Sequence, residues 1–224
     1  MLSHFQKLVE RLVRDDTGDL TPDDVEAGIE FAISRYSKDR PRSVVEDVTS
    51  TGGQFLPLPD SWVGGFSEIQ AMESPIGEVP PRFFDDDEFA IYEAPSGEQI
   101  MLTQSLADGD LVRVRFTAFH LLSNTEDSIP VAEREAVACY AAAHCCEQLA
   151  SLYSGDSDSS IQADSVDHAG AGSRFSRRAD KLRQRYFDEL GIEPKRSAPA
   201  GVVVDMDLRD SRGRDRLLHS ERYR

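Results

Sequence analysis

Apolar residues recur at intervals of three and four positions in four stretches of the chain, and this spacing predicts four helices. Their expected bounds are residues 3–14, 21–40, 130–152 and 175–190. Pro130 suits the first turn of the third helix, since its missing N–H is not needed there. Gly191 is placed to end the fourth helix. The third and fourth helices are expected to form a hairpin across the polar break at residues 154–160.

The third predicted helix is unusual in the size of its side chains. From Cys139 to Cys146 it reads CYAAAHCC, so a neighbouring helix can approach it closely. Its larger apolar residues, among them Val137, Leu149 and Leu152, are expected to lie on one buried face.

The second predicted helix has clear start and stop signals. Thr21 can cap the first turn, Pro22 fits the first helical position, and the aspartates that follow favour the positive end of the helix dipole. Arg40 precedes Pro41, and the residue before a proline is disfavoured in helical geometry.

Between residues 44 and 119 the period of the apolar positions changes to two, which predicts short strands. The expected strands are residues 44–49, 66–72, 89–92, 99–102 and 111–119. Residues 95–97 are expected to join the third and fourth of these strands as a hairpin. Gly52–Gly53 and Asp108–Asp110 are interpreted as turns between strands. Two prolines make residues 55–59 an edge or extended segment.

Together these elements predict an α+β fold. We expect a helical bundle, made of two N-terminal helices plus a long helical hairpin, with an inserted small antiparallel β module and an extended C-terminal tail. The expected bounds are residues 1–41 and 130–191 for the helical body, 42–129 for the β module and 192–224 for the tail. The tail has too few apolar residues to form a core of its own.

The net charge of −16 is unevenly distributed along the chain. Residues 174–224 hold 14 Lys and Arg against 9 Asp and Glu, a net of +5. The remaining 173 residues hold 11 against 32, a net of −21. An acidic body disfavours a surface that grips DNA, because phosphate contacts need Lys and Arg. It suits a surface past which DNA slides without adhering, a basic partner, or simply a soluble protein.

Neither a membrane-spanning run nor an N-terminal secretory signal is recognisable, so no membrane partner is expected. Three cysteines do not predict a disulfide framework, and cytosolic synthesis is expected. Cys145 and Cys146 are candidate nucleophiles, but thiols within an alanine-rich helix are more often unreactive core residues.

The acidic run Asp85–Glu88 is a candidate cation site, yet adjacent carboxylates on a loop rarely converge on one ion. Asp156 and Asp158 resemble the start of a calcium loop but lack its glycine and its distal glutamate. The five histidines show no ligand spacing; they are His4, His120, His144, His168 and His219.

Nucleotide-binding signals are equally weak. Trp62 has no basic neighbours to help hold a nucleobase, and Gly52–Gly53 and Gly64–Gly65 lack the strand and helix that flank a phosphate-binding loop. The sequence therefore predicts no catalytic residue, no cofactor and no metal, and the protein is expected not to be an enzyme.

Four short segments carry a resemblance to a known family. They are residues 35–41 (RYSKDRP), 74–77 (SPIG), 112–117 (VRVRFT) and 140–143 (YAAA). With these segments and the order of its elements, the chain resembles the head-to-tail adaptor, or connector, proteins of tailed bacteriophages over most of its length. The resemblance lies in layout and short segments and includes no catalytic signature.

This resemblance implies a structural virion protein. Copies in that family form a ring, commonly a dodecamer, beneath the portal protein, and the ring continues the DNA channel toward the tail. The implied partners are other copies of the chain, the portal protein, tail or other neck proteins, and DNA that passes without specific binding. The implied location is the neck of the virion, after synthesis in the host cytoplasm.

The resemblance also implies that the C-terminal tail reaches the portal. The candidate portal-binding residues are Val202, Val203, Val204, Arg209, Arg212, Arg214, Arg216, Leu217 and Leu218. The valines can add a strand to an exposed sheet edge, and the arginines can steer the tail to an acidic surface. Two alternatives stay open: a neck stopper or tail-completion protein, and a nucleic-acid-binding protein that acts through its Arg-rich tail.

Overall fold

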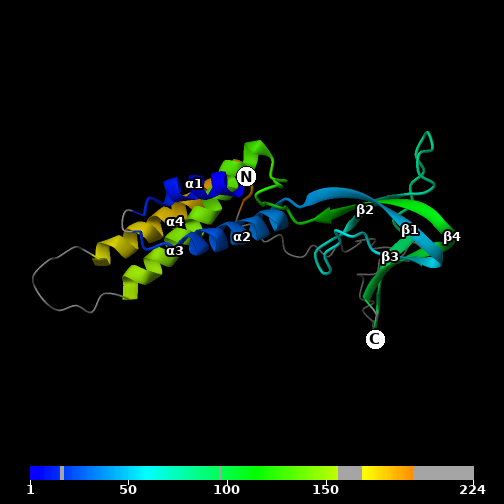
Figure 1. Ribbon diagram of the computed structural model, residues 1–224, viewed down its shortest axis with the longest axis horizontal. Coiled ribbons are helices and arrows are strands. Elements are labelled where there is room, and N and C mark those ends of the chain that lie inside the picture. Colours follow the sequence, from blue (N-terminus) through cyan, green and yellow to red (C-terminus); the bar gives the residue numbers. More distant parts are fainter. Residues whose placement is uncertain (16–17, 96, 156–167, 194–224) are drawn as a thin grey trace, which may run out of the picture. The chain divides into compact units, whose positions relative to one another are not determined.

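A computed structural model of the chain describes residues 1–15, 18–95, 97–155 and 168–193, and Figure 1 shows its helices and strands. The helices are α1 (Leu2–Val13), α2 (Pro22–Asp39), α3 (Arg134–Gly155) and α4 (His168–Leu190), with a 3-10 turn η1 (Val131–Glu133) before α3. The strands are β1 (Arg42–Leu56), β2 (Ile69–Glu73), β3 (Phe89–Ala94) and β4 (Gly97–Ala118). The four predicted helices are confirmed, although α4 begins at His168 rather than near Phe175. The part of the predicted polar break that follows Gly155 lies outside the described residues.

The start of α2 forms as its sequence predicts. The Thr21 hydroxyl accepts a hydrogen bond from the Asp24 amide at 3.2 Å, and the Asp24 carboxylate accepts one from the Thr21 amide at 2.9 Å. This reciprocal capping box satisfies two backbone donors that the first turn would otherwise leave free. The helix ends at Asp39, just before Arg40 and Pro41.

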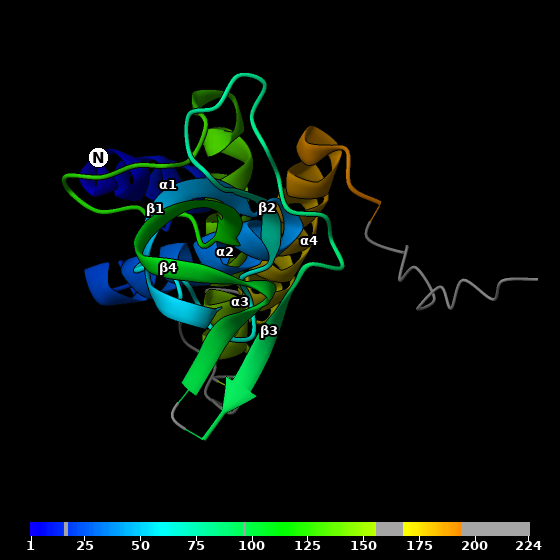
Figure 2. The same cartoon turned by 90° about the vertical axis from the view of Figure 1, so that its right-hand side faces the viewer.

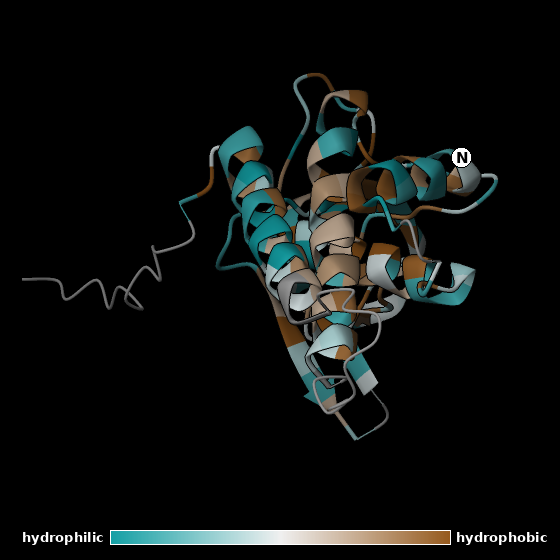
Figure 3. Cartoon of the chain, turned by 90° about the vertical axis from the view of Figure 1, so that its left-hand side faces the viewer, coloured by the Kyte–Doolittle hydropathy of each residue, from teal (hydrophilic) through white to brown (hydrophobic). Residues whose placement is uncertain are grey.

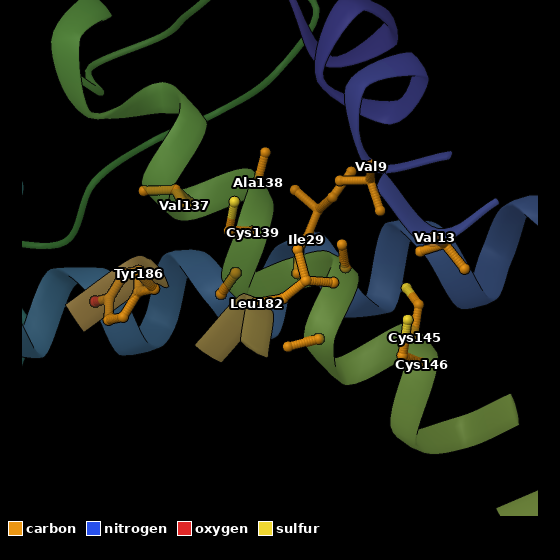
Figure 4. Close-up of a cluster of buried hydrophobic side chains, with 14 of the residues drawn as sticks. Val9, Val13, Ile29, Val137, Ala138, Cys139, Cys145, Cys146, Leu182 and Tyr186 are labelled. Carbon is orange, nitrogen blue, oxygen red and sulfur yellow. The ribbon is translucent and has the colours of Figure 1, made fainter. Parts of the chain in front are cut away.

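Helix α3 is the centre of the helical core. Its residues 136–139 and 141–143 are all buried, and side chains of α1, α2 and α4 surround it (Figure 4). The prediction of a single buried face is therefore wrong for residues 136–146, because alanine and cysteine are small enough to be covered on almost every side. Farther along α3, burial is one-sided. Leu149 is buried as expected, at 1% exposed, whereas Leu152 is 50% exposed.

Close approach of α2 to α3 depends on a glycine. A Cβ atom placed on Gly28 would lie 2.8 Å from the Cys145 sulfur and 3.4 Å from the Ala141 carbonyl oxygen. There is thus no room for a larger side chain unless α3 moves. The prediction that the small residues of α3 admit a close neighbour is confirmed.

Helices α3 and α4 form an antiparallel pair. Tyr140 lies against Tyr186, with ring centroids 4.7 Å apart, and Tyr153 stacks on Phe175 at 5.7 Å. Gly191 ends α4 with a positive φ of 67°, and the amide of the next residue donates to the carbonyl of Phe187 at 2.9 Å. The predicted C-terminal glycine cap is confirmed.

Strand β4 organises the sheet. It pairs with β1 along most of its length, and its other edge pairs with β3 near its start and with β2 near its end, all antiparallel. The predicted hairpin is confirmed as β3 and the start of β4, at the lower edge of Figure 2. Inward-facing residues of the sheet and its loops, among them Met72, Phe84, Val114 and Phe116, form a second hydrophobic core.

The turns predicted at Gly52–Gly53 and Asp108–Asp110 are wrong. The two strands continue through these positions, where Thr51 pairs with Asp108 and the register of the ladder shifts on either side. Gly52, Gly53 and Gly109 have φ values between 86° and 90°, which glycine adopts without strain. The glycines therefore bend paired strands as β-bulges do, instead of ending them.

The predicted fold class is consequently wrong in its proportions. We expected a helical bundle carrying a small β module, but β1 has 15 residues, β4 has 22, and the sheet encloses a hydrophobic core of its own. The described residues form an α+β fold, with four helices around one core and a four-stranded antiparallel sheet around another. The error follows from the glycines, since each supposed turn divided one long strand into two short ones.

His120 joins the helices to the sheet. It follows β4 and is 7% exposed, and its ring packs against Tyr36 of α2 at 4.6 Å. One ring nitrogen lies 2.9 Å from the Arg40 carbonyl oxygen, and the other lies 3.1 Å from the carbonyl and hydroxyl oxygens of Ser128. A single side chain thus links the end of α2, the end of β4 and the loop before α3.

We predict that Leu149→Ala lowers the free energy of unfolding by about 2–5 kcal/mol, because it leaves a cavity in the core around α3. The matched control is Leu152→Ala on the same helix, which should change stability by less than about 0.5 kcal/mol because this side chain is half exposed. Denaturant unfolding of both variants measures the difference. Equal effects would contradict the assigned inner face of α3.

We also predict that stability falls in mild acid through His120. Burial lowers the pKa of this histidine, the nearby Arg42 lowers it further, and the Arg40 and Ser128 carbonyls and Glu133 oppose the shift. The unfolded chain, with a pKa of about 6.5, therefore binds the proton first as the pH falls. The free energy of unfolding should be largest above about pH 6.5 and decline as the pH drops through the folded pKa.

Denaturant unfolding between about pH 7.5 and about pH 5.5 tests the role of His120. The variant His120→Gln should be less stable at neutral pH but should lose most of the pH dependence in this range. Parallel pH profiles for the two proteins would assign the dependence to other groups.

Candidate interaction surface

The predicted portal-binding residues cannot be placed, because the described part of the chain ends at Glu193. All nine lie outside it: Val202, Val203, Val204, Arg209, Arg212, Arg214, Arg216, Leu217 and Leu218. Asp156 and Asp158 also lie outside the described residues. A functional surface must therefore be sought on the helices and the sheet.

The acidic run Asp85–Glu88 forms a solvent-exposed turn. The Glu88 carboxylate accepts a hydrogen bond from the Asp85 amide at 2.9 Å, and the Glu88 amide donates to the Asp85 carbonyl, also at 2.9 Å. The first three carboxylates of the run are exposed to water. Across the described residues, no three His, Cys, Asp or Glu side chains are grouped so that they could hold a metal ion.

The three cysteines are buried in the helical core. Burial raises the pKa of Cys145 to about 12, and it raises the pKa values of Cys139 and Cys146 to about 11. A thiol reacts as its thiolate, so these side chains are poor nucleophiles in the folded protein. The small sulfur atoms fill space around α3, as Figure 4 shows.

Trp62 and His144 are also occupied by packing. The Trp62 indole donates a hydrogen bond to the Glu98 carboxylate at 2.9 Å, and its ring lies 5.7 Å from that of Phe116. The His144 ring lies 4.6 Å from that of Phe31, between α3 and α2. Within the described residues, no helix combines the length and apolar character that a membrane span requires.

An exposed apolar patch lies on the outer face of the sheet, which we call the sheet patch. It consists of Phe55 of β1, Tyr92 of β3 and Met101 of β4, which are 42%, 43% and 39% exposed. Met101 lies between the other two strands, because it pairs with Phe55 on one side and with Ala90 on the other. The rings of Phe55 and Tyr92 are 5.5 Å apart. Three strands therefore contribute to one continuous apolar surface.

The opposite face of the same strands packs into the sheet core. Ile100 and Leu102, the neighbours of Met101 in β4, are buried in the sheet core at 0% and 2% exposed. Side chains alternate along a strand, so Met101 must point the other way. Both faces of this part of the sheet are apolar, and the fold covers one of them.

The sheet region that carries the sheet patch is strongly acidic in composition. Residues 42–120 hold 14 Asp and Glu against 4 Arg and no Lys. Of the four arginines, Arg113 is neutralised by Asp47, with side-chain distances of 2.8 and 3.0 Å. The sheet thus presents aromatic and aliphatic groups within an acidic field, a combination suited to a partner with apolar and basic groups.

Sequence reasoning missed the sheet patch because the turns assigned at the glycines divided the strands that build it. A signal was present in the run Ile100–Met101–Leu102. Three consecutive large apolar residues in a strand place one side chain on the face opposite to the other two. Such a run indicates an apolar group on both faces of the sheet.

We predict that the cysteines do not react with a thiol reagent such as Ellman's reagent at about pH 8 while the protein is folded, because burial keeps their pKa values well above that pH. All three should react once denaturant unfolds the chain. A rapid reaction of the native protein, measured by absorbance, would show that α3 is more accessible than its packing indicates.

The comparisons with known proteins do not assign the chain to a family. No protein-family model matches the sequence, and no curated protein shows significant similarity to it. The function must therefore be inferred from the chain's own residues, of which the sheet patch and the acidic charge around it are the most informative.

Proposed function

We propose that the protein is a structural virion protein, a ring-forming head-to-tail adaptor that joins the portal to the tail and continues the DNA channel in the neck of a bacteriophage. The observation that carries this proposal is the sheet patch. Phe55, Tyr92 and Met101 form an exposed apolar surface on the sheet, within a region whose composition is strongly acidic.

Exposed apolar clusters of this kind are typical of protein contacts. Single apolar residues at a surface need no explanation, but a contiguous apolar patch indicates a site of interaction. Aromatic residues and methionine are enriched at the centres of protein interfaces, where they bury large areas at low entropic cost. In the neck, we assign the sheet patch to contact with an adjoining neck or tail protein.

The charge of the described residues agrees with a channel that DNA passes through. Phosphate binding needs Lys and Arg, and the sheet region holds 14 acidic residues against 4 basic ones. A wall of like charge repels DNA and limits adhesion during its passage. The same charge disfavours nucleic-acid binding by the sheet.

The tail supplies the contact with the portal in this proposal. Residues 194–224 lie outside the described residues. The apolar run Val202–Val204 suits addition to a sheet edge, and the arginines from Arg209 to Arg216, with Leu217 and Leu218 beyond them, suit an acidic partner surface. Attraction between charges would set the rate of association, and the docked strand would set its lifetime.

Mixing the purified protein with portal rings of the virus that encodes it tests the proposal. Electron-microscope class averages should show a second ring on the portal axis. Deletion of residues 194–224 should abolish attachment to the portal while leaving thermal unfolding of the helical core unchanged. A full-length protein that never joins the portal would overturn the adaptor function.

The role of the sheet patch needs a separate variant. The double substitution Phe55→Ser and Tyr92→Ser should preserve attachment to the portal but prevent the adaptor from recruiting the next neck or tail component, measured by co-sedimentation. The matched control is Val79→Ser, which removes an apolar side chain that is 96% exposed outside the patch. Full recruitment by the double variant would exclude the patch from this contact.

A further inference from the structure

The outer face of α2 combines carboxylates with an exposed aromatic ring. Asp23, Glu26 and Glu30 are exposed and recur at intervals of three and four residues, which places them in one row. Phe31, which follows Glu30, is 50% exposed and lies at the edge of this surface, on the side toward α3. Its ring is held by α3, where it stacks on Tyr140 at a centroid distance of 6.0 Å. We call this surface the α2 face.

The outer face of α4 carries a basic row with the same spacing. Arg174, Arg177 and Lys181 are exposed and recur at intervals of three and four residues. The outward side of α4 is almost entirely hydrophilic in Figure 3, where this helix is at the left. We call this surface the α4 face.

The other arginines of α4 have partners within the molecule, whereas the residues of the two rows have none among the described residues. Arg178 donates to the Val13 carbonyl at 2.6 Å, Arg183 pairs with Glu147, and Arg185 pairs with both Glu135 and Glu189. Within the described residues, the six side chains of the two rows make no ion pair and no side-chain hydrogen bond. Their charges remain available to another molecule.

The two faces cannot meet within one molecule. Both α2 and α4 bury their inner sides against α3, with Ile29 from one helix and Leu182 from the other in the same core (Figure 4). The carboxylates and the basic residues point away from that core. A contact between the rows therefore requires two copies of the chain.

We propose that the α4 face of one copy binds the α2 face of the next, in a contact between two different surfaces of identical chains. The complementary signs and the matched spacing favour this pairing over a contact of either face with itself. An arginine of the α4 face would also cover the exposed ring of Phe31, a cation–π contact that guanidinium makes readily. The occupant of the α2 face is thus a second copy of this chain.

A contact between two different faces has a geometric consequence. When two copies bind, each uses one face and leaves its other face free for a further copy. Copies therefore add head to tail until the last binds the first. Such a contact builds a ring or a filament and not a closed two-fold dimer. This inference rests on the proposed ring-forming function and identifies the surface that would make the ring.

Charge reversal provides a direct test. The basic-face variant Arg177→Glu/Lys181→Glu and the acidic-face variant Glu26→Lys/Glu30→Lys should each assemble about tenfold more weakly than the wild type or worse, because like charges then face one another. An equal mixture of the two should assemble again, since each reversed face finds a complementary one on the other variant. A single chain that carries all four substitutions should also assemble. Sedimentation velocity of each protein, alone and with portal rings, measures assembly.

Two further variants complete the experiment. Phe31→Ala should weaken assembly about tenfold without affecting attachment of the tail to the portal. The matched control is Lys7→Glu/Arg11→Glu, which makes the same charge change on the exposed side of α1 and should leave assembly unchanged. Circular dichroism of every variant establishes that the helices remain folded.

The outcomes separate this inference from the adaptor function. If the wild type assembles and both reversal variants assemble as well as it does, the α2–α4 contact is wrong while the adaptor function stands. Failure of the mixed variants to assemble, where the α1 control succeeds, would likewise overturn the contact. A wild type that neither assembles nor joins the portal would overturn both.

Discussion

The burial of the first half of α3 on almost all sides is the constraint on which the helical part of the molecule depends. Its alanines and cysteines contribute little volume, so stability requires neighbours that come very close. Gly28 allows α2 to do so, since a Cβ atom there would lie 2.8 Å from the Cys145 sulfur. The same packing raises the pKa values of the thiols and makes them structural. Helices α1, α2 and α4 thus bury their inner sides against α3 and present polar outer faces.

A set of polar contacts joins the helical core to the sheet. Arg40, at the end of α2, pairs with Glu133 and donates to the Leu190 carbonyl at 2.8 Å, while the Tyr186 hydroxyl donates to Asp39 at 2.7 Å. From the far end of β4, the His120 ring donates a hydrogen bond to the Arg40 carbonyl. These contacts join residues that are 80 to 150 positions apart in the chain. The ends of α2 and α4 and the two long strands, β1 and β4, are therefore fixed to one another.

The surfaces that remain divide into two kinds. The helices expose charged rows of opposite sign on α2 and α4, and the sheet exposes an apolar patch in an acidic field. Charged rows suit association that is fast and salt-sensitive, whereas aromatic patches suit contacts that last. A protein that assembles with its own copies and also holds a different partner would use both kinds of surface, and this division agrees with the proposed adaptor.

The sequence by itself determined the helices, their caps, the β3–β4 hairpin and the small-residue contact, because each depends on local spacing or on one side chain. Tertiary structure decided the course of β1 and β4 through their glycines, since a partner strand can hold a positive φ that would otherwise mark a turn. It also decided that the first half of α3 is covered on almost every side and that Phe55, Tyr92 and Met101 meet. Phe55 is distant in the chain from the hairpin that carries Tyr92 and Met101, and only the pairing of β1 with β4 brings it onto their face.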